Sequence, residues 1–122
     1  MKTILWVAAG GACGAVLRYC VQAMASGTEF PWGTLLVNIA GCLAIGLAIG
    51  CFAGATWFET VGRPLLVAGV LGGFTTFSAF SVDTVLLWEQ RRVVAAVAYV
   101  VSSVACCLLA AAVGYRVAGA LA

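Results

Sequence analysis

The chain has 122 residues, of which 65% are hydrophobic and 8% are charged, and its net charge is +2. Soluble domains are about half apolar and about one-quarter charged, so this composition does not provide a polar surface for contact with water. The few, scattered basic residues also exclude the clustered positive face of a nucleic-acid-binding protein. We therefore expect a membrane protein, with the lipid bilayer as its solvent and residues 1–122 as one domain.

Four apolar stretches are long enough to cross a membrane as helices, which takes about 20 residues each. The uncharged stretch after Lys2 is longer than the core of a signal peptide, which favours a retained first span. Pro64 suits the first turn of the third helix, where its missing N–H is not needed, and residues 56–63 are then a loop. The fold class is an all-α membrane protein whose four transmembrane helices are residues 3–24, 32–55, 64–88 and 93–121.

Tryptophan and glycine positions support this division. Tryptophan rings settle at the headgroup level, and here they lie near span ends, at Trp6, Trp32, Trp57 and Trp88. Glycines four residues apart give faces for close helix packing within or between subunits, and the pattern occurs at Gly10 with Gly14 and at Gly46 with Gly50 and Gly54.

The basic residues are divided evenly between the two sides that four spans create. The side of the N-terminus receives Lys2, Arg63 and Arg116, and the opposite side receives Arg18, Arg91 and Arg92. Orientation follows the excess of positive charge on cytoplasmic loops, so this distribution gives no preferred orientation. Either one dominant loop sets a single orientation, or copies insert both ways and pair as a dual-topology antiparallel homodimer.

The third span contains the segment Gly72-Gly73-Phe74-Thr75-Thr76, which is poor in helix-forming residues. Each glycine costs about 1 kcal/mol relative to alanine in a helix, so the sequence predicts a break near the middle of the membrane. Non-helical backbone at that depth must be buried in protein or face a water-filled cavity. Carbonyl oxygens freed around Gly72 and Thr75 suit a hard cation, and in an antiparallel dimer this site would lie on the two-fold axis.

Polar and aromatic side chains lie close to this break. Asn38, inside the second span, either bridges two helices or donates to a permeating anion. Phe77 and Phe80 share one helix face, and they either pack in the ordinary way or present their positive ring edges to an anion. Ser78 and Ser81 add hydroxyl donors nearby.

The fourth span carries Tyr99, Ser103 and Cys107 four residues apart, which places them in one stripe. The stripe is either a packing surface whose hydroxyls bond to the backbone or one side of a polar track. Arg18 is expected to extend to an interface or to pair with an acid. No acidic residue lies near the middle of a span, which argues against a proton-coupled carrier.

Six cysteines lie in or beside the apolar segments. None forms a Cys-x-x-Cys pair, and the chain has no histidine, so the usual zinc ligand sets are excluded. We expect these cysteines to be small packing residues. They are Cys13, Cys20, Cys42, Cys51, Cys106 and Cys107.

Three motifs occur in order along the chain. They are Gly-Gly-Ala-Cys-Gly-Ala-Val-Leu-Arg-Tyr at 10–19, Gly-Thr-Leu-Leu-Val-Asn-Ile-Ala-Gly at 33–41, and Gly-Gly-Phe-Thr-Thr-Phe-Ser-Ala-Phe-Ser at 72–81. Together they make the whole chain resemble the Fluc (CrcB) family of fluoride channels. The chain departs from that family at Ala79, where threonine is usual, and at Cys107, where a hydroxyl residue is common.

The resemblance implies a passive fluoride channel of the bacterial inner membrane, and not an enzyme, that relieves fluoride toxicity by letting the ion leave the cytoplasm. It also implies an antiparallel homodimer with two pores and a central structural sodium ion, Na+, held by the backbone carbonyls of Gly72 and Thr75. Arg18 would lie in the pore vestibule. The implied pore-lining residues are Asn38, Phe77, Phe80, Ser78 and Ser81, with Tyr99 and Ser103 in the polar track.

Two other classes of protein have a comparable length. A small four-helix multidrug exporter requires an acidic residue in its first span, and residues 3–24 contain none. A non-transporting membrane subunit would leave Asn38, the break and the two phenylalanines without a shared purpose.

Overall fold

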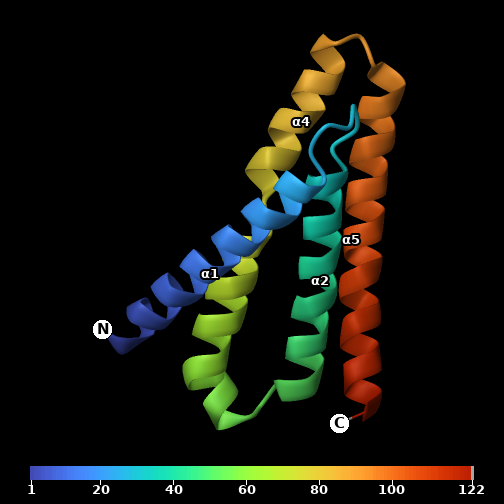
Figure 1. Ribbon diagram of the computed structural model, residues 1–122. Helices are drawn as coiled ribbons and strands as arrows, with labels where there is room; N and C mark the ends of the chain where they lie inside the picture. Colours follow the sequence, from blue (N-terminus) through green and yellow to red (C-terminus); the bar gives the residue numbers. More distant parts are fainter. Residues whose placement is uncertain (122) are drawn as a thin grey trace.

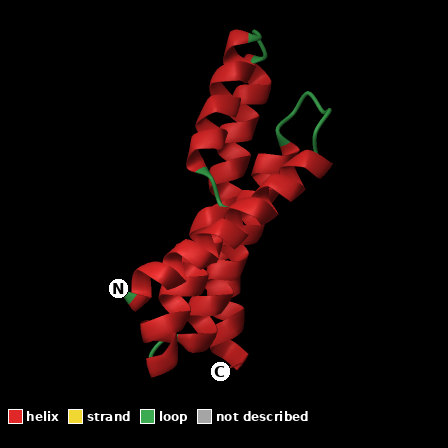
Figure 2. Cartoon of the chain, turned by 60° about the vertical axis from the view of Figure 1, so that its left-hand side comes forward, coloured by secondary structure: helices red, strands yellow, loops and turns green. Residues whose placement is uncertain are grey.

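The computed structural model describes residues 1–121, and within them only helices and short connections occur (Figures 1 and 2). Three consecutive helices form the third span, which runs from Phe58 to Glu89. Four segments are long and apolar enough to cross a membrane, so the predicted four-span architecture is confirmed. The helices are α1 (Lys2–Met24), α2 (Trp32–Phe52), η1 (Phe58–Leu71), α3 (Gly72–Phe74), α4 (Phe77–Glu89) and α5 (Val93–Leu121).

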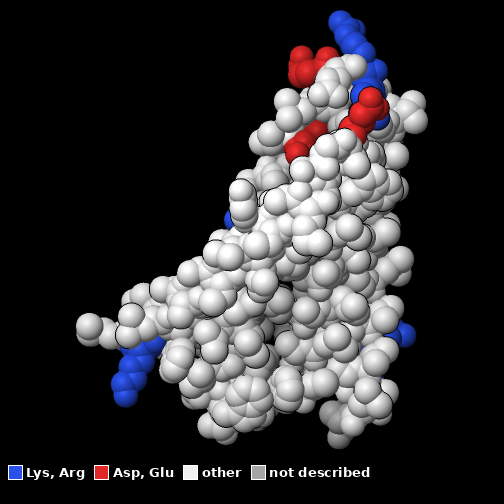
Figure 3. Space-filling model, viewed as in Figure 1, with Lys and Arg blue, Asp and Glu red and all other residues white. Residues whose placement is uncertain are grey.

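The helices pack as two pairs that join segments far apart in the sequence. Helix α2 lies along α5, and α1 crosses η1 and α3, whereas consecutive spans share far fewer contacts (Figure 1). The chain ends and the connection from α2 to η1 lie at the lower end in Figure 1, and the other two connections lie at the upper end. Most charged side chains visible in Figure 3 are near these ends, with an almost uncharged belt between them. This distribution fits a protein that crosses a bilayer.

Glycines make both helix pairs close, as their spacing predicts. A Cβ atom at Gly50 would lie 2.6 Å from the Tyr115 carbonyl oxygen, and one at Gly14 would lie 2.8 Å from the Phe74 nitrogen. Gly10 and Gly46 face backbone atoms in the same way, so all four contacts occur within one chain. Gly54 does not belong to this set, because it follows α2 with a φ of +87° and faces open space.

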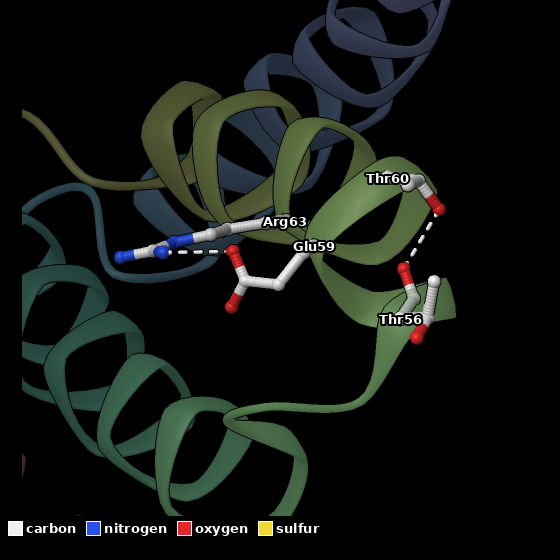
Figure 4. A network of polar contacts seen from close by, with 4 residues as sticks. All are labelled: Thr56, Glu59, Thr60 and Arg63. Atoms are coloured by element: carbon white, nitrogen blue, oxygen red, sulfur yellow. Dashed lines mark hydrogen bonds and ion pairs between the residues drawn. The ribbon is translucent and has the colours of Figure 1, made fainter.

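The start of the third span differs from the prediction. Residues 56–63 are helical rather than a loop, so Pro64 lies well inside η1. Figure 4 shows the contacts of this first turn, where Thr60 donates to the Thr56 carbonyl at 2.8 Å and Arg63 pairs with Glu59 at 3.0 Å. The helix η1 has wide π-type turns, and such local changes of winding accommodate the donor that a proline lacks.

A small aromatic cluster closes the upper end of the molecule. Tyr99 of α5 is fully buried and packs with Leu35 of α2 and Leu87 of α4. The Phe30 ring meets the Tyr99 ring edge-on at 5.5 Å between centroids. This cluster fixes α4 against α5 just above the break in the third span, which positions the site described below.

Candidate functional site

The third span is interrupted at Thr75 and Thr76, which confirms the predicted break. Both residues are extended, with ψ of 156° at Thr75 and 114° at Thr76. The glycines thought to cause the break are helical, because Gly72 and Gly73 belong to α3. Gly73 serves packing instead, since a Cβ atom there would lie 2.6 Å from the Gly11 carbonyl oxygen of α1.

Asn38 stabilises the extended backbone. Its Oδ1 accepts the Thr76 N–H at 2.8 Å, and its Nδ2 donates to the Thr76 carbonyl at 3.0 Å. In a continuous helix this N–H would instead donate to Gly72, four residues earlier. Of the two interpretations of Asn38, the structure therefore shows the interhelical bridge, and it explains how a break is tolerated at this depth.

Thr76 also caps the helix that follows the break. Its Oγ1 accepts the Ala79 N–H at 3.1 Å, which is the usual contact of a threonine at a helix N-cap. The sequence analysis treated Thr76 only as part of the break. The signal that could have identified its role is a threonine directly before an apolar run of helical length.

Arg18 neither extends to an interface nor pairs with an acid. Its Nη1 donates to the Thr75 carbonyl at 3.2 Å, so a guanidinium lies beside the break. That carbonyl has no helical partner because Thr75 is extended, and it is an available acceptor closer than any carboxylate. The arginine therefore lies deeper than expected and joins α1 to the middle of the third span.

A groove with a volume of about 340 Å³ opens beside the break, between α2, α5 and the third span. Several predicted site residues line it, namely Asn38, Gly72, Thr75, Phe77, Phe80 and Ser103. The structure adds Thr76, Cys42 and Cys107 to this lining. None of the described residues that line the groove carries a charge.

Ser103 is the most informative residue of the groove. Its side chain is 5% exposed, and its Oγ has no hydrogen-bond partner among the described residues. Buried hydroxyls almost always have a partner, so such an atom indicates a missing ligand or water. Ser102, its neighbour, bonds to the Tyr99 carbonyl in the manner of a packing residue.

The aromatic residues form a continuous row beside the groove. The Phe77 and Phe80 rings are 5.4 Å apart between centroids, and the Phe80 and Tyr99 rings are 5.3 Å apart. Phe77 is 78% exposed, whereas Tyr99 is fully buried and donates to Asp83 Oδ2 at 3.3 Å. The pairing of Tyr99 with Asp83 was missed because the two residues lie on different spans.

The other predicted site residues lie outside the groove lining. Ser81 donates to the Phe77 carbonyl at 2.9 Å, and the Ser78 hydroxyl lies 3.2 Å from Thr76 Oγ1. Tyr99 separates the groove from a second cavity of about 270 Å³ at the upper end, lined by Gln22, Thr34 and Asp83 among others. Gln22 donates to Thr34 there at 3.1 Å.

The fold and this site define a multi-pass membrane protein with an uncharged, polar groove at the depth of a broken helix. Comparison with known proteins gives the family. The chain matches the model of the family described as CrcB-like protein, Camphor Resistance (CrcB), over residues 5–115. The chain belongs to this CrcB family.

Individual relatives cover almost the whole chain. A fluoride-specific ion channel FluC of Chelativorans sp. (strain BNC1) is 48% identical over 117 residues, which is 93% of this chain and 94% of the relative. A protein of the same name from Paracoccus denitrificans (strain Pd 1222) is 47% identical over 117 residues, covering 94% of this chain and 93% of its own. Another, from Rhizobium johnstonii (strain DSM 114642 / LMG 32736 / 3841), is 46% identical and covers 100% of both chains. These names describe ion channels and not enzymes.

Proposed function

We propose that this protein is a passive, fluoride-selective channel and that fluoride passes through the groove beside the break. The observation that carries the proposal is the Ser103 hydroxyl, which is buried without a partner and faces a groove free of charged side chains. Neutral donors and aromatic edges attract an anion weakly enough to release it again. The relatives named fluoride-specific ion channels support the same ion.

The proposed physiological role is the removal of a toxic ion from the cytoplasm. Hydrogen fluoride crosses lipid uncharged and dissociates in a near-neutral cytoplasm, where the anion is trapped. An inside-negative potential drives the anion outward with about 2.3 kcal/mol per charge per 100 mV. A channel therefore suffices, and neither an energy-coupling step nor an enzymatic reaction is needed.

The proposed assembly is an antiparallel homodimer with two pores. One chain leaves the groove open on one side, and the Phe77 ring is 78% exposed there, so a second copy is needed to enclose the path. With Arg18 at the break, the two ends hold Lys2, Arg63 and Arg116 against Arg91 and Arg92, which is still a small bias. Small biases favour insertion in both orientations.

The broken backbone fits the proposed structural sodium ion in its donor chemistry. The Thr76 N–H donates to Asn38, which leaves the Gly72 carbonyl without its helical partner. The Thr75 carbonyl is also outside any helix and retains a lone pair beyond the one that Arg18 occupies. Two such carbonyls from each chain would give the all-oxygen environment that hard cations prefer, and the ion would hold the two copies together.

The decisive experiment is fluoride efflux from liposomes that contain the purified protein, with chloride-loaded liposomes as the control. We expect rapid efflux of fluoride and none of chloride. Phe77→Ile should slow it severely, because it removes an exposed ring edge without removing packing inside the chain. Equal chloride efflux, or no fluoride efflux from correctly folded protein, would contradict the proposal.

A multidrug exporter and a non-transporting subunit agree less well with the site. An exporter that exchanges protons for cationic drugs requires an acidic residue in its first span, and α1 contains none. A subunit that only packs against partners gives no reason for an unpartnered hydroxyl in an open groove. The relatives of nearly full-length similarity are named as channels.

A further inference from the structure

Two of the six cysteines differ from the rest in their surroundings. Cys42 of α2 and Cys107 of α5 are partly buried, and both line the groove. The other four, Cys13, Cys20, Cys51 and Cys106, are exposed on the outer surface. The expectation that all six serve as packing residues therefore does not explain this pair.

The register of α2 against α5 places the two thiols opposite each other. Gly46 faces Ala111 and Gly50 faces Tyr115, so residues that face each other across this helix pair differ by 65 in number. Cys42 and Cys107 differ by the same 65. Their thiol groups lie close enough to interact.

Two thiols on facing, close-packed helices define a restricted kind of ligand. Within residues 1–121 no group of three or more His, Cys, Asp or Glu residues could hold a metal ion, which excludes the four-coordinate sites typical of zinc. Soft sulfur ligands select soft cations such as Cu+, and Cu+ and Ag+ accept two sulfur ligands in a line. We propose that Cys42 and Cys107 form a two-thiol binding site for a soft monovalent cation, Ag+ or Cu+.

The binding step requires no oxidant or reductant. One thiol releases its proton to water and binds as a thiolate, and the other donates a sulfur lone pair with its proton retained. The thiolate charge and the cation charge cancel, so the occupied site is neutral overall. Neutrality suits this groove, because an isolated charge buried among apolar groups is costly.

The site lies one helical turn from the polar end of the groove. Cys42 follows Asn38 by four residues on α2, and Cys107 follows Ser103 by four on α5. One turn is about 5.4 Å along the helix axis, so a bound cation would fill the groove beside these residues. Inhibition of fluoride efflux by Ag+ is the expected consequence, and this consequence alone rests on the proposed function.

The test uses the full chain with its four exposed cysteines replaced by alanine, which retains Cys42 and Cys107. A thiol titration first confirms that both are reduced, and Ag+ is then added as the nitrate and followed by calorimetry and by proton release. We expect one Ag+ and one proton per chain. Cys42→Ser or Cys107→Ser should weaken binding by at least about 100-fold, because even groups behind the metal ligands contribute 10–100-fold.

A matched variant retains Cys42 and Cys106 instead and carries Cys107→Ser. Cys106 precedes Cys107 by one residue but is exposed outside the groove, so this chain has two thiols that cannot meet. Equal Ag+ affinity for the two chains, or loss of binding with neither single substitution, would overturn the site. Size-exclusion profiles identify any variant that is misfolded.

Fluoride efflux is measured on the same two chains to separate the two proposals. Ag+ should stop efflux only through the chain that retains Cys42 and Cys107. Tight binding to this pair with unchanged efflux would support the metal site and contradict fluoride passage through the groove. Absence of any fluoride efflux would contradict the proposed function, whereas the binding measurement would still decide the metal site.

Discussion

Asn38 satisfies both backbone groups of Thr76, accepting its N–H at 2.8 Å and donating to its carbonyl at 3.0 Å. One side chain thus replaces the hydrogen bonds that a continuous helix would have supplied at this position. The Gly72 carbonyl is free as a consequence, and α4 starts in a direction that carries Phe77 and Phe80 along the groove.

Asn38→Leu should destabilise the fold by about 1–3 kcal/mol, because it leaves two partly buried backbone groups without partners. Thermal unfolding in detergent measures the change. Ser81→Ala is the control, since the Ser81 hydroxyl only bonds back to its own helix at Phe77. Similar melting temperatures for the two variants would show that Asn38 does not hold the break.

Ser103→Ala should separate function from stability. The Ser103 hydroxyl has no partner in the chain, so its removal should leave the free energy of unfolding unchanged within about 0.5 kcal/mol. Fluoride efflux should fall about tenfold if the hydroxyl donates one hydrogen bond to the ion. Ser102→Ala is the matched control and should leave efflux unchanged, because that hydroxyl bonds to the Tyr99 carbonyl. Undiminished efflux in Ser103→Ala would argue against a donor role.

Two glycines of α5 should respond oppositely to alanine. A Cβ atom at Gly114 would lie 2.5 Å from the Leu43 carbonyl oxygen, whereas one at Gly119 would meet nothing within 4 Å. Gly114→Ala should therefore cost about 1–3 kcal/mol through overpacking. Gly119→Ala should be neutral or stabilise by up to about 1 kcal/mol through helix propensity. Thermal unfolding of both variants checks the predicted register of α2 on α5, and an unaffected Gly114→Ala would refute it.

Arg18→Gln tests the relation between the arginine and the proposed sodium site. The guanidinium donates to the Thr75 carbonyl, so its charge opposes a cation bound to the same oxygen. Removing the charge while keeping an amide donor should let Na+ bind severalfold more tightly. The measurement is the sodium concentration that half-protects the dimer against thermal dissociation. An increase in that concentration would mean that Arg18 assists the cation rather than opposing it.

The sequence predicted the span boundaries well where polar and apolar segments alternate sharply. The fourth span begins at Val93 and ends at Leu121, as predicted, and α1 begins one residue earlier than expected. The start of the third span was wrong because Pro64 was given its preference for the first helical turn. A change of helical winding offsets the cost of an internal proline, and a residue preference does not include such a change.

The site could be predicted in its members but not in its contacts. Asn38, Phe77, Phe80 and Ser103 do line one groove. The break was predicted from two glycines, yet it lies just after them, because a side chain on another helix supplies the bonds that stabilise it. Arg18 was misplaced for the same reason, since its partner is a backbone carbonyl that becomes available only after the third span has broken.

The pairing of the helices has a consequence for biosynthesis. The closest contacts join α2 to α5 and α1 to η1, so no span packs mainly on the one synthesised directly before or after it. The glycine face of α2 at Gly46 and Gly50 cannot be covered until α5 has left the ribosome, because its partners are Ala111 and Tyr115. The second span must therefore wait in the membrane with that face against lipid. Assembly of the native helix bundle is accordingly a post-translational event that begins only when the last span has been inserted.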